Sequence, residues 1–193
     1  LGTYATPVAR QDLALSRLAT IYSLTEHGTF YIDSADGEAP NPFAPYTVDK
    51  VMARGRVLSS KPPVLPLMMT GEYVILRHLF GLELTDESDR SVIIRILTLT
   101  FMGIPFVLTV LVFDRTIALF AIDPLIRHLM MLFLAFGTQL WGYSLIINNH
   151  IPGTFCLMLS VYLALGLIYG KWKPSAWRFV AFGAAAGLVL TID

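Results

Sequence analysis

The stretch VIIRILTLTFMGIPFVLTVLVF, residues 92–113, carries a single charged side chain, Arg95, and is long enough to cross a lipid bilayer. Apolar runs follow at 129–147 and 151–170, and a further run at 177–193 is shorter than a span requires. The chain is 55% hydrophobic and 15% charged, with a mean hydropathy of +0.63, a balance that soluble domains rarely reach. The sequence therefore predicts an all-α integral membrane protein with several spanning helices.

Charge and cysteine content exclude several classes of protein. The 14 Lys and Arg residues balance the 14 Asp and Glu residues, so no net charge points to nucleic acid as a partner. Cys156 is the single cysteine and lies inside an apolar run, which excludes an internal disulfide and a cysteine metal cluster. No ligand cluster implies a metal, although a divalent ion would be compatible with the sequence, and no cofactor is expected.

The two ends of the sequence predict that the chain is a fragment. It begins with Leu1 rather than methionine, and no signal peptide precedes the polar first segment. We therefore expect the amino-terminal part of a longer membrane protein.

Residues 1–61 are polar and mixed, and predict a loop outside the membrane with some structure of its own. Helical spacing of apolar residues indicates a helix ending at Gly28, and a strand could start at 30–32. A loop is expected next, followed by two short strands around a turn that contains Gly55. We expect the helix at 11–27, the loop at 34–45 and the two strands at 46–51 and 57–60.

Loop charges predict the side of the membrane that each segment faces. The loops at 114–128 and 170–178 carry Lys and Arg and are expected to be cytoplasmic. The mostly acidic loop at 81–90 and the loop at 148–150, which has no Lys or Arg, are expected outside. The apolar segment 62–81 either spans the membrane or lies along its surface as an amphipathic helix. Its internal charges favour the surface position, which places residues 1–61 outside.

Basic residues gather around the expected hairpin, where an anion could bind. Lys61 in the stretch SSKPP (59–63) would stand at the membrane boundary, where its ammonium could hold a lipid phosphate. Lys50 and Arg56 lie close by in sequence, and an arginine would add forked hydrogen-bond donors. The alternative is a solvated hairpin in which Lys61 extends to the membrane surface without a ligand.

Asp12 and Asp49 are candidate general bases for an acceptor hydroxyl near the outer surface. Asp12 could instead serve as a helix N-terminal acid that the macrodipole favours, and Asp49 could form an ion pair within a strand. His150, which follows two asparagines in an expected external loop, could bind a phosphate or metal, or be an ordinary polar loop residue.

Several motifs together resemble the amino-terminal half of GT-C-type membrane glycosyltransferases. They are the Ser16-Arg17 pair with an acid in the first loop, TVDKV (47–51), RGRVLSSKPP (54–63) and GTQLWGYSLIINNHIPG (137–153). The chain is similar in this respect to family 39-like bacterial proteins, relatives of protein O-mannosyltransferases and lipid A aminoarabinose transferases. The resemblance covers nearly the whole chain, and its most specific parts are Asp49-Lys50 and Ser60-Lys61-Pro62-Pro63.

The resemblance implies an enzyme that moves a sugar from a polyprenyl-phosphate carrier to an acceptor hydroxyl on the outer face of the bacterial plasma membrane. It implies a first-loop aspartate, Asp12 or Asp49, as the base, and Lys61 as the phosphate contact. Arg17, Lys50, Arg56 and His150 are the further candidates for binding phosphate or substrate. Relatives place the acid two or three positions before the arginine, where this chain has Leu15 and Ala14.

The expected partners are a lipid-linked sugar, an acceptor of unknown identity and membrane lipid, and nucleotide sugars are not expected on that face of the membrane. One alternative is a non-catalytic polytopic protein that binds or translocates polyprenyl-phosphate lipids. A purely structural membrane subunit is another, for which Lys61 would have no role in binding or transfer.

Overall fold

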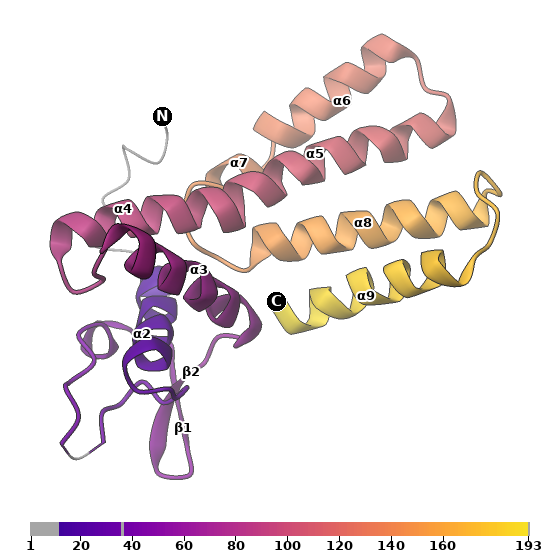
Figure 1. The fold of residues 1–193 in the computed structure, drawn as a ribbon. Helices are drawn as coiled ribbons and strands as arrows, with labels where there is room; N and C mark the ends of the chain where they lie inside the picture. Colours follow the sequence, from indigo (N-terminus) through magenta and orange to yellow (C-terminus); the bar gives the residue numbers. More distant parts are fainter. Residues whose placement is uncertain (1–11, 36, 193) are drawn as a thin grey trace. The chain divides into compact units, whose positions relative to one another are not determined.

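The computed structural model is mostly helical, with one small two-stranded sheet (Figure 1). It describes residues 12–35 and 37–192, with side chains from Ala14 onward. The chain divides into two compact units. The first comprises Leu1–Leu99 with Ile146–Asn148, and the second comprises Thr100–Leu145 with Asn149–Asp193. The helical class with a small hairpin, predicted from the sequence, is confirmed.

The first unit is built around helix α2 (Asp12–Glu26), which packs against α3 (Val64–Phe80). Residues 16–23 of α2 are all buried, including the apolar Leu18 and Ile21, so this part of the helix lies in the interior of the unit. Gly28 follows the helix with a φ of 64°, a left-handed conformation that glycine adopts without strain. The predicted helix and its stop at Gly28 are confirmed.

Strands β1 (Lys50–Ala53) and β2 (Arg56–Ser59) form an antiparallel hairpin in which Lys50 pairs with Ser59. Its two turn residues, Arg54 and Gly55, have φ angles of 53° and 76°. Positive φ at both positions is typical of a type I′ turn, whose twist matches that of the strands. The predicted hairpin with glycine at its turn is therefore confirmed.

The first strand begins later than the sequence predicted. Residues Ala44–Tyr46 form the 3-10 helix η2, which Pro45 favours through its fixed φ. The expected strand over 46–51 is wrong at 46–49, because Tyr46 belongs to η2 and β1 begins only at Lys50. The strand expected near 30–32 is reduced to a single bridge between Tyr31 and Leu58, extended by a hydrogen bond from Ile32 N to Val57 O of 2.8 Å.

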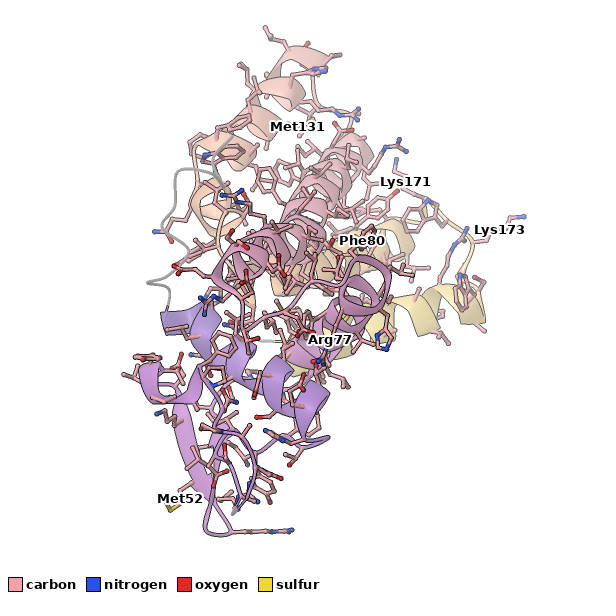
Figure 2. The ribbon with its side chains drawn as sticks, turned by 60° about the vertical axis from the view of Figure 1, so that its left-hand side comes forward. Met52, Arg77, Phe80, Met131, Lys171 and Lys173 are labelled. Atoms are coloured by element: carbon pink, nitrogen blue, oxygen red, sulfur yellow. The ribbon has the colours of Figure 1, made fainter. Side chains whose placement is uncertain are left out.

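Helix α3 is joined to its neighbours by Arg77, which is labelled in Figure 2. The Arg77 guanidinium donates to the carboxylates of Glu26 at the end of α2 and Glu83 in the following loop. Gly81 ends α3 with a φ of 69°, and Asp86 caps α4 (Glu87–Thr98) by accepting from the N–H groups of Ser88 and Asp89. Hydrogen bonds from the Ser88 hydroxyl and the Asp89 N–H lower the pKa of the Asp86 carboxyl.

The second unit is made of helices. Their bounds are η3, a π-helix, Leu99–Gly103; α5 Ile104–Ile117; η4 Ala118–Phe120; α6 Pro124–Phe136; α7 Leu140–Tyr143; α8 His150–Ile168; and α9 Ala176–Ile192. Helix α8 packs against both α5 and α9, as Figure 1 shows. The backbone of Gly166 in α8 lies directly against the indole of Trp172, whose ring also meets Tyr162 edge-on with centroids 4.9 Å apart.

Two helical stretches in the described residues are long and apolar enough to cross a membrane by length and composition. They are Glu87–Phe120, which runs through α4, η3, α5 and η4, and His150–Ile168, which is α8. The expected spans at 92–113 and 151–170 fall on these two stretches. Helices α6 and α9 are apolar but shorter, and the last of them agrees with the short run expected at 177–193.

The expected uninterrupted helix over 129–147 is wrong, because α6 ends at Phe136. Gly137 is the C-cap and donates its N–H to Phe133 O at 2.8 Å, and the Thr138 hydroxyl donates back to Leu134 O at 2.7 Å. Only the short helix α7 follows, before the chain reaches α8. Glycine has low helix propensity and threonine hydroxyls bind nearby carbonyls, so the composition of an apolar run can hide such a break.

Candidate functional site

Four segments of the first unit meet at a hydrogen-bonded cluster, which we call the Asp49–Lys61 site. It consists of Ser16 on α2, Asp49 before β1, Ser59 at the end of β2, and Ser60 and Lys61 after it. The Ser16 hydroxyl donates to the Asp49 carbonyl oxygen at 3.1 Å, and Ser60 N–H donates to the same oxygen at 3.1 Å. Helix α2 thereby fixes the backbone at the beginning of the hairpin.

The two serine hydroxyls of the site are joined to each other, with their oxygens 2.6 Å apart. Because the one Ser16 hydroxyl proton is directed at Asp49 O, the Ser59 hydroxyl is the donor of this bond. The Ser59 oxygen in turn accepts from Lys61 N–H at 3.1 Å. The backbones of Asp49 and Lys61 are therefore held through one continuous chain of hydrogen bonds.

The side chains of Asp49 and Lys61 form an ion pair across the site. Lys61 Nζ lies 3.1 Å from Asp49 Oδ1, and the two side chains are 24% and 20% exposed. A carboxylate and an ammonium are thus brought together at a position that solvent and solutes can reach. The site therefore joins the carboxylate that was predicted as a candidate base to the ammonium that was predicted as a candidate phosphate contact.

Lys61 also stands next to the beginning of a helix. Two prolines separate it from Val64, the first residue of α3, and the capping residue Pro63 provides no side-chain cap. The N-terminal end of a helix carries a partial positive charge from its peptide dipoles. That charge has the same sign as the Lys61 ammonium, so both favour an anion at this place.

No family model, curated protein or solved structure matches this chain. Its function must therefore be argued from the residues and the geometry of the site.

Three further cationic residues predicted to bind phosphate lie elsewhere in the first unit. Arg17 follows Ser16 on α2, but its side chain is only 1% exposed and belongs to the interior. The Arg56 guanidinium is held by Asp33, through Nε to Oδ2 at 2.9 Å and a second bond to the carbonyl oxygen, and lies over the Tyr31 ring. Lys50 is exposed and lines an open pocket of about 350 Å³ with Asp33 and Asn41.

The other two predicted site residues are Asp12 and His150. The side chain of Asp12 lies outside the described residues, although α2 begins at that position. His150 belongs to the second unit, where it begins α8 and its ring meets Tyr143 edge-on at a centroid distance of 5.2 Å. Within the described part of the chain, no group of three or more His, Cys, Asp or Glu side chains is arranged to hold a metal ion.

The sequence interpretation assigned no role to Ser16 and Ser59, although both stand in motifs that were singled out. It also missed Asn41, a buried residue that ties the loop before η2 to α2. The Asn41 amide donates to Ala19 O and Ser23 Oγ, both at 2.8 Å, and its oxygen accepts from the N–H groups of Phe43 and Ala44. The signal for Asn41 was its place between two prolines, because asparagine side chains commonly bind the backbone of turns.

Proposed function

We propose that this chain is part of a GT-C-type glycosyltransferase that takes a sugar from a polyprenyl-phosphate donor on the outer face of a bacterial plasma membrane. The observation that carries the proposal is the Asp49–Lys61 pair, with its atoms 3.1 Å apart and its side chains partly exposed to solvent. Transfer of this kind needs a base for the acceptor hydroxyl and a cation for the leaving phosphate. The pair supplies one group of each type.

In the proposed reaction, the Asp49 carboxylate accepts the proton of the acceptor hydroxyl. The acceptor oxygen attacks the anomeric carbon from the side opposite the phosphate, and the bond from that carbon to the phosphate oxygen breaks. Polyprenyl phosphate leaves with the electron pair of that bond, and the configuration of the sugar inverts. Lys61, together with the N-terminal end of α3, stabilises the charge that develops on the departing phosphate.

The regularity of α2 favours Asp49 over Asp12 as the base. Helix α2 runs from Asp12 to Glu26, and five residues rotate an α-helix by about 500°, which leaves positions 12 and 17 about 140° apart. The relatives that the sequence resembles place an acid nearer to the arginine, so Asp12 does not reproduce that arrangement. Asp49 instead meets Lys61 directly, and Arg17 is buried in the interior of the unit.

The membrane setting is supported by the two long apolar stretches and by the charges of the loops. We propose that further crossings involve α6 and α9, and that α3 lies at the membrane surface with residues 1–61 outside. This arrangement would place the Asp49–Lys61 site beside the lipid, where a polyprenyl phosphate is presented.

Transfer can be tested with the full-length protein in lipid vesicles that contain labelled polyprenyl-phosphate sugars. Release of polyprenyl phosphate is expected to fall about 10²–10⁴-fold in Asp49→Asn, the range for loss of a general base, and about 10²–10³-fold in Lys61→Ala. Asp12→Asn should retain most of the activity. Lys171→Ala is the matched control, because it removes the same ammonium from an exposed loop position of the second unit.

Equal release by Asp49→Asn and the wild type would contradict the assignment of the base. If no donor is turned over while the wild type still binds the lipid through Lys61, the non-catalytic alternative, a protein that binds or translocates polyprenyl-phosphate lipids, takes the place of the enzyme.

A further inference from the structure

In the Asp49–Lys61 site, the two charged groups bind each other. Lys61 Nζ is 3.1 Å from Asp49 Oδ1, so the ammonium that should meet a phosphate already holds a carboxylate. An incoming phosphate must compete with Asp49 for the same cation. The ammonium has three N–H donors, but a phosphate bound to it beside Asp49 would bring two negative charges together, so the intact pair disfavours phosphate binding.

We propose that Asp49 and Lys61 form an exchangeable pair, in which the lipid phosphate replaces the Asp49 carboxylate on Lys61 and thereby releases Asp49 to act on the acceptor. The release of a base by the donor rests on the proposed function, whereas the competition for Lys61 does not. In this arrangement the acceptor hydroxyl meets a free carboxylate only when a phosphate already occupies the site.

The hydrogen bonds of the site allow this exchange without movement of the backbone. The carbonyl of Asp49 is fixed by Ser16 and Ser60, and the N–H of Lys61 is fixed by Ser59. Separation of the pair therefore needs only rotation about side-chain bonds, of which lysine has several. Because about a fifth to a quarter of each side chain is exposed, the phosphate can approach from the solvent side.

The charges of the ligands give the exchange a direction. A phosphate that carries a sugar is a diester with one negative charge, equal to that of the carboxylate it replaces. Once the bond to the sugar breaks, the phosphate becomes a monoester that carries about 1.5 to 2 negative charges at neutral pH. Lys61 should therefore bind the leaving group more strongly than it binds Asp49, which keeps the pair apart until the product leaves.

A fixed structural ion pair makes the opposite prediction for binding. If Asp49 only orients Lys61, its replacement by asparagine should weaken phosphate binding or leave it unchanged. If Asp49 competes with phosphate, the same replacement should strengthen binding. The sign of the change therefore distinguishes the two roles.

The test is equilibrium binding of polyprenyl phosphate, which carries no sugar and cannot be turned over, to the full-length protein in neutral-lipid nanodiscs. Asp49→Asn should bind it about two- to fivefold more tightly than the wild type, the change expected when an exposed ion pair no longer competes. Lys61→Met should lose most of the binding. Glu38→Gln is the control, since it removes one negative charge from an exposed position of the same unit. Its change in affinity should be less than half of the change seen in Asp49→Asn.

Inorganic phosphate is titrated in parallel to identify the part of the ligand that is recognised. Tighter binding of both probes by Asp49→Asn supports exchange with any phosphate group. Tighter binding of polyprenyl phosphate alone supports exchange only with a phosphate that the membrane presents. Equal or weaker binding by Asp49→Asn with both probes overturns the proposal. Asp49→Ala is measured in the same way, and circular dichroism and thermal unfolding show which variants are folded. The direction of the change in affinity is then taken from a folded variant.

The outcomes for the exchange and for the proposed function can be told apart. Sugar transfer by the wild type without a gain in Asp49→Asn overturns the exchange and leaves the glycosyltransferase in place. Tighter binding by Asp49→Asn without transfer from any donor overturns the proposed function and leaves the exchange as a property of a lipid-binding protein.

Discussion

Ser16 is a single hydroxyl on α2 that joins two segments distant in the chain. It is fully buried, and its bonds reach Asp49, 33 residues away, and Ser59, 43 residues away. Its neighbours along the helix are Leu15 and the buried Arg17, and the helical pattern does not require a serine between them. The residue therefore contributes to the site by position and not by reactivity.

We predict that Ser16→Ala lowers the stability of the protein by about 1 kcal/mol. Loss of the hydroxyl leaves the Asp49 carbonyl and the Ser59 hydroxyl with one bond fewer, at a cost of about 1–2 kcal/mol, and the better helix propensity of alanine offsets up to about 0.5 kcal/mol. Chemical denaturation in detergent micelles measures the change. Ser60→Ala is the control, because its side chain is exposed and its bond to Asp49 uses the backbone N–H; an equal loss there would contradict the role of Ser16.

At this scale the sequence predicted the types of residue but not their pairing. Asp49 and Lys61 were each identified from local motifs, and an ion pair within its strand was the alternative to a role of Asp49 as a base. The structure pairs it with Lys61, because the hairpin brings the two ends of its strands together. Arg56 illustrates the limit, since its partner Asp33 lies 23 residues earlier and the sequence contains no signal for that contact.

Among the elements, the contact between α8 and the loop before α9 depends on one glycine. A Cβ atom at Gly166 would lie 2.3 Å from Cζ3 of Trp172, a distance that real side chains do not tolerate. The backbone N–H of Trp172 also donates to Gly166 O at 3.2 Å, so both the ring and the backbone of Trp172 are held against α8.

We predict that Gly166→Ala displaces the Trp172 ring into a more polar environment and destabilises the protein by about 1–3 kcal/mol, the usual range for overpacking. The shift is measured as a longer wavelength of tryptophan emission, with Trp141 and Trp177 replaced by phenylalanine. Gly183→Ala is the matched control on α9, since a Cβ there has no atom within 4 Å. An unchanged spectrum in Gly166→Ala would show that the loop does not hold Trp172 against α8.

Element boundaries were predicted well where a glycine or a charge marks them and poorly where the run stays apolar. The end of α2 just before Gly28 and the turn at Gly55 follow from backbone conformations that glycine favours. The end of α6 was missed because Gly137 stands within an apolar run whose hydropathy continues past it. Hydropathy reports solvent preference and carries little information on where a helix stops.

At the scale of the whole molecule, the proposal depends on which side of the membrane the first unit faces. We predict that a cysteine at Met52, at an exposed position of β1, is labelled in intact cells by a maleimide that cannot cross the membrane. A cysteine at Lys173 should be labelled only after permeabilisation, because the positive charges of its loop favour the cytoplasm. Both positions are exposed and are labelled in Figure 2.

Replacement of the buried Cys156 by alanine removes the background in both variants. The reverse pattern of labelling would put the Asp49–Lys61 site in the cytoplasm and contradict a donor presented on the outer face. Labelling of both positions in intact cells would contradict the expected number of crossings between them.

The π-helix η3 has a consequence for how the length of this protein can vary. A π-turn closes its hydrogen bonds over one residue more than an α-turn, so Leu99–Gly103 can be viewed as α-helix that has absorbed one extra residue. Losing one residue there would restore ordinary α-helical winding to this segment. Losing one elsewhere in α5 would turn every later side chain of that helix by about 100°. In an alignment of homologous sequences, gaps of one position should therefore collect at 99–103 and be rare in the rest of this helix.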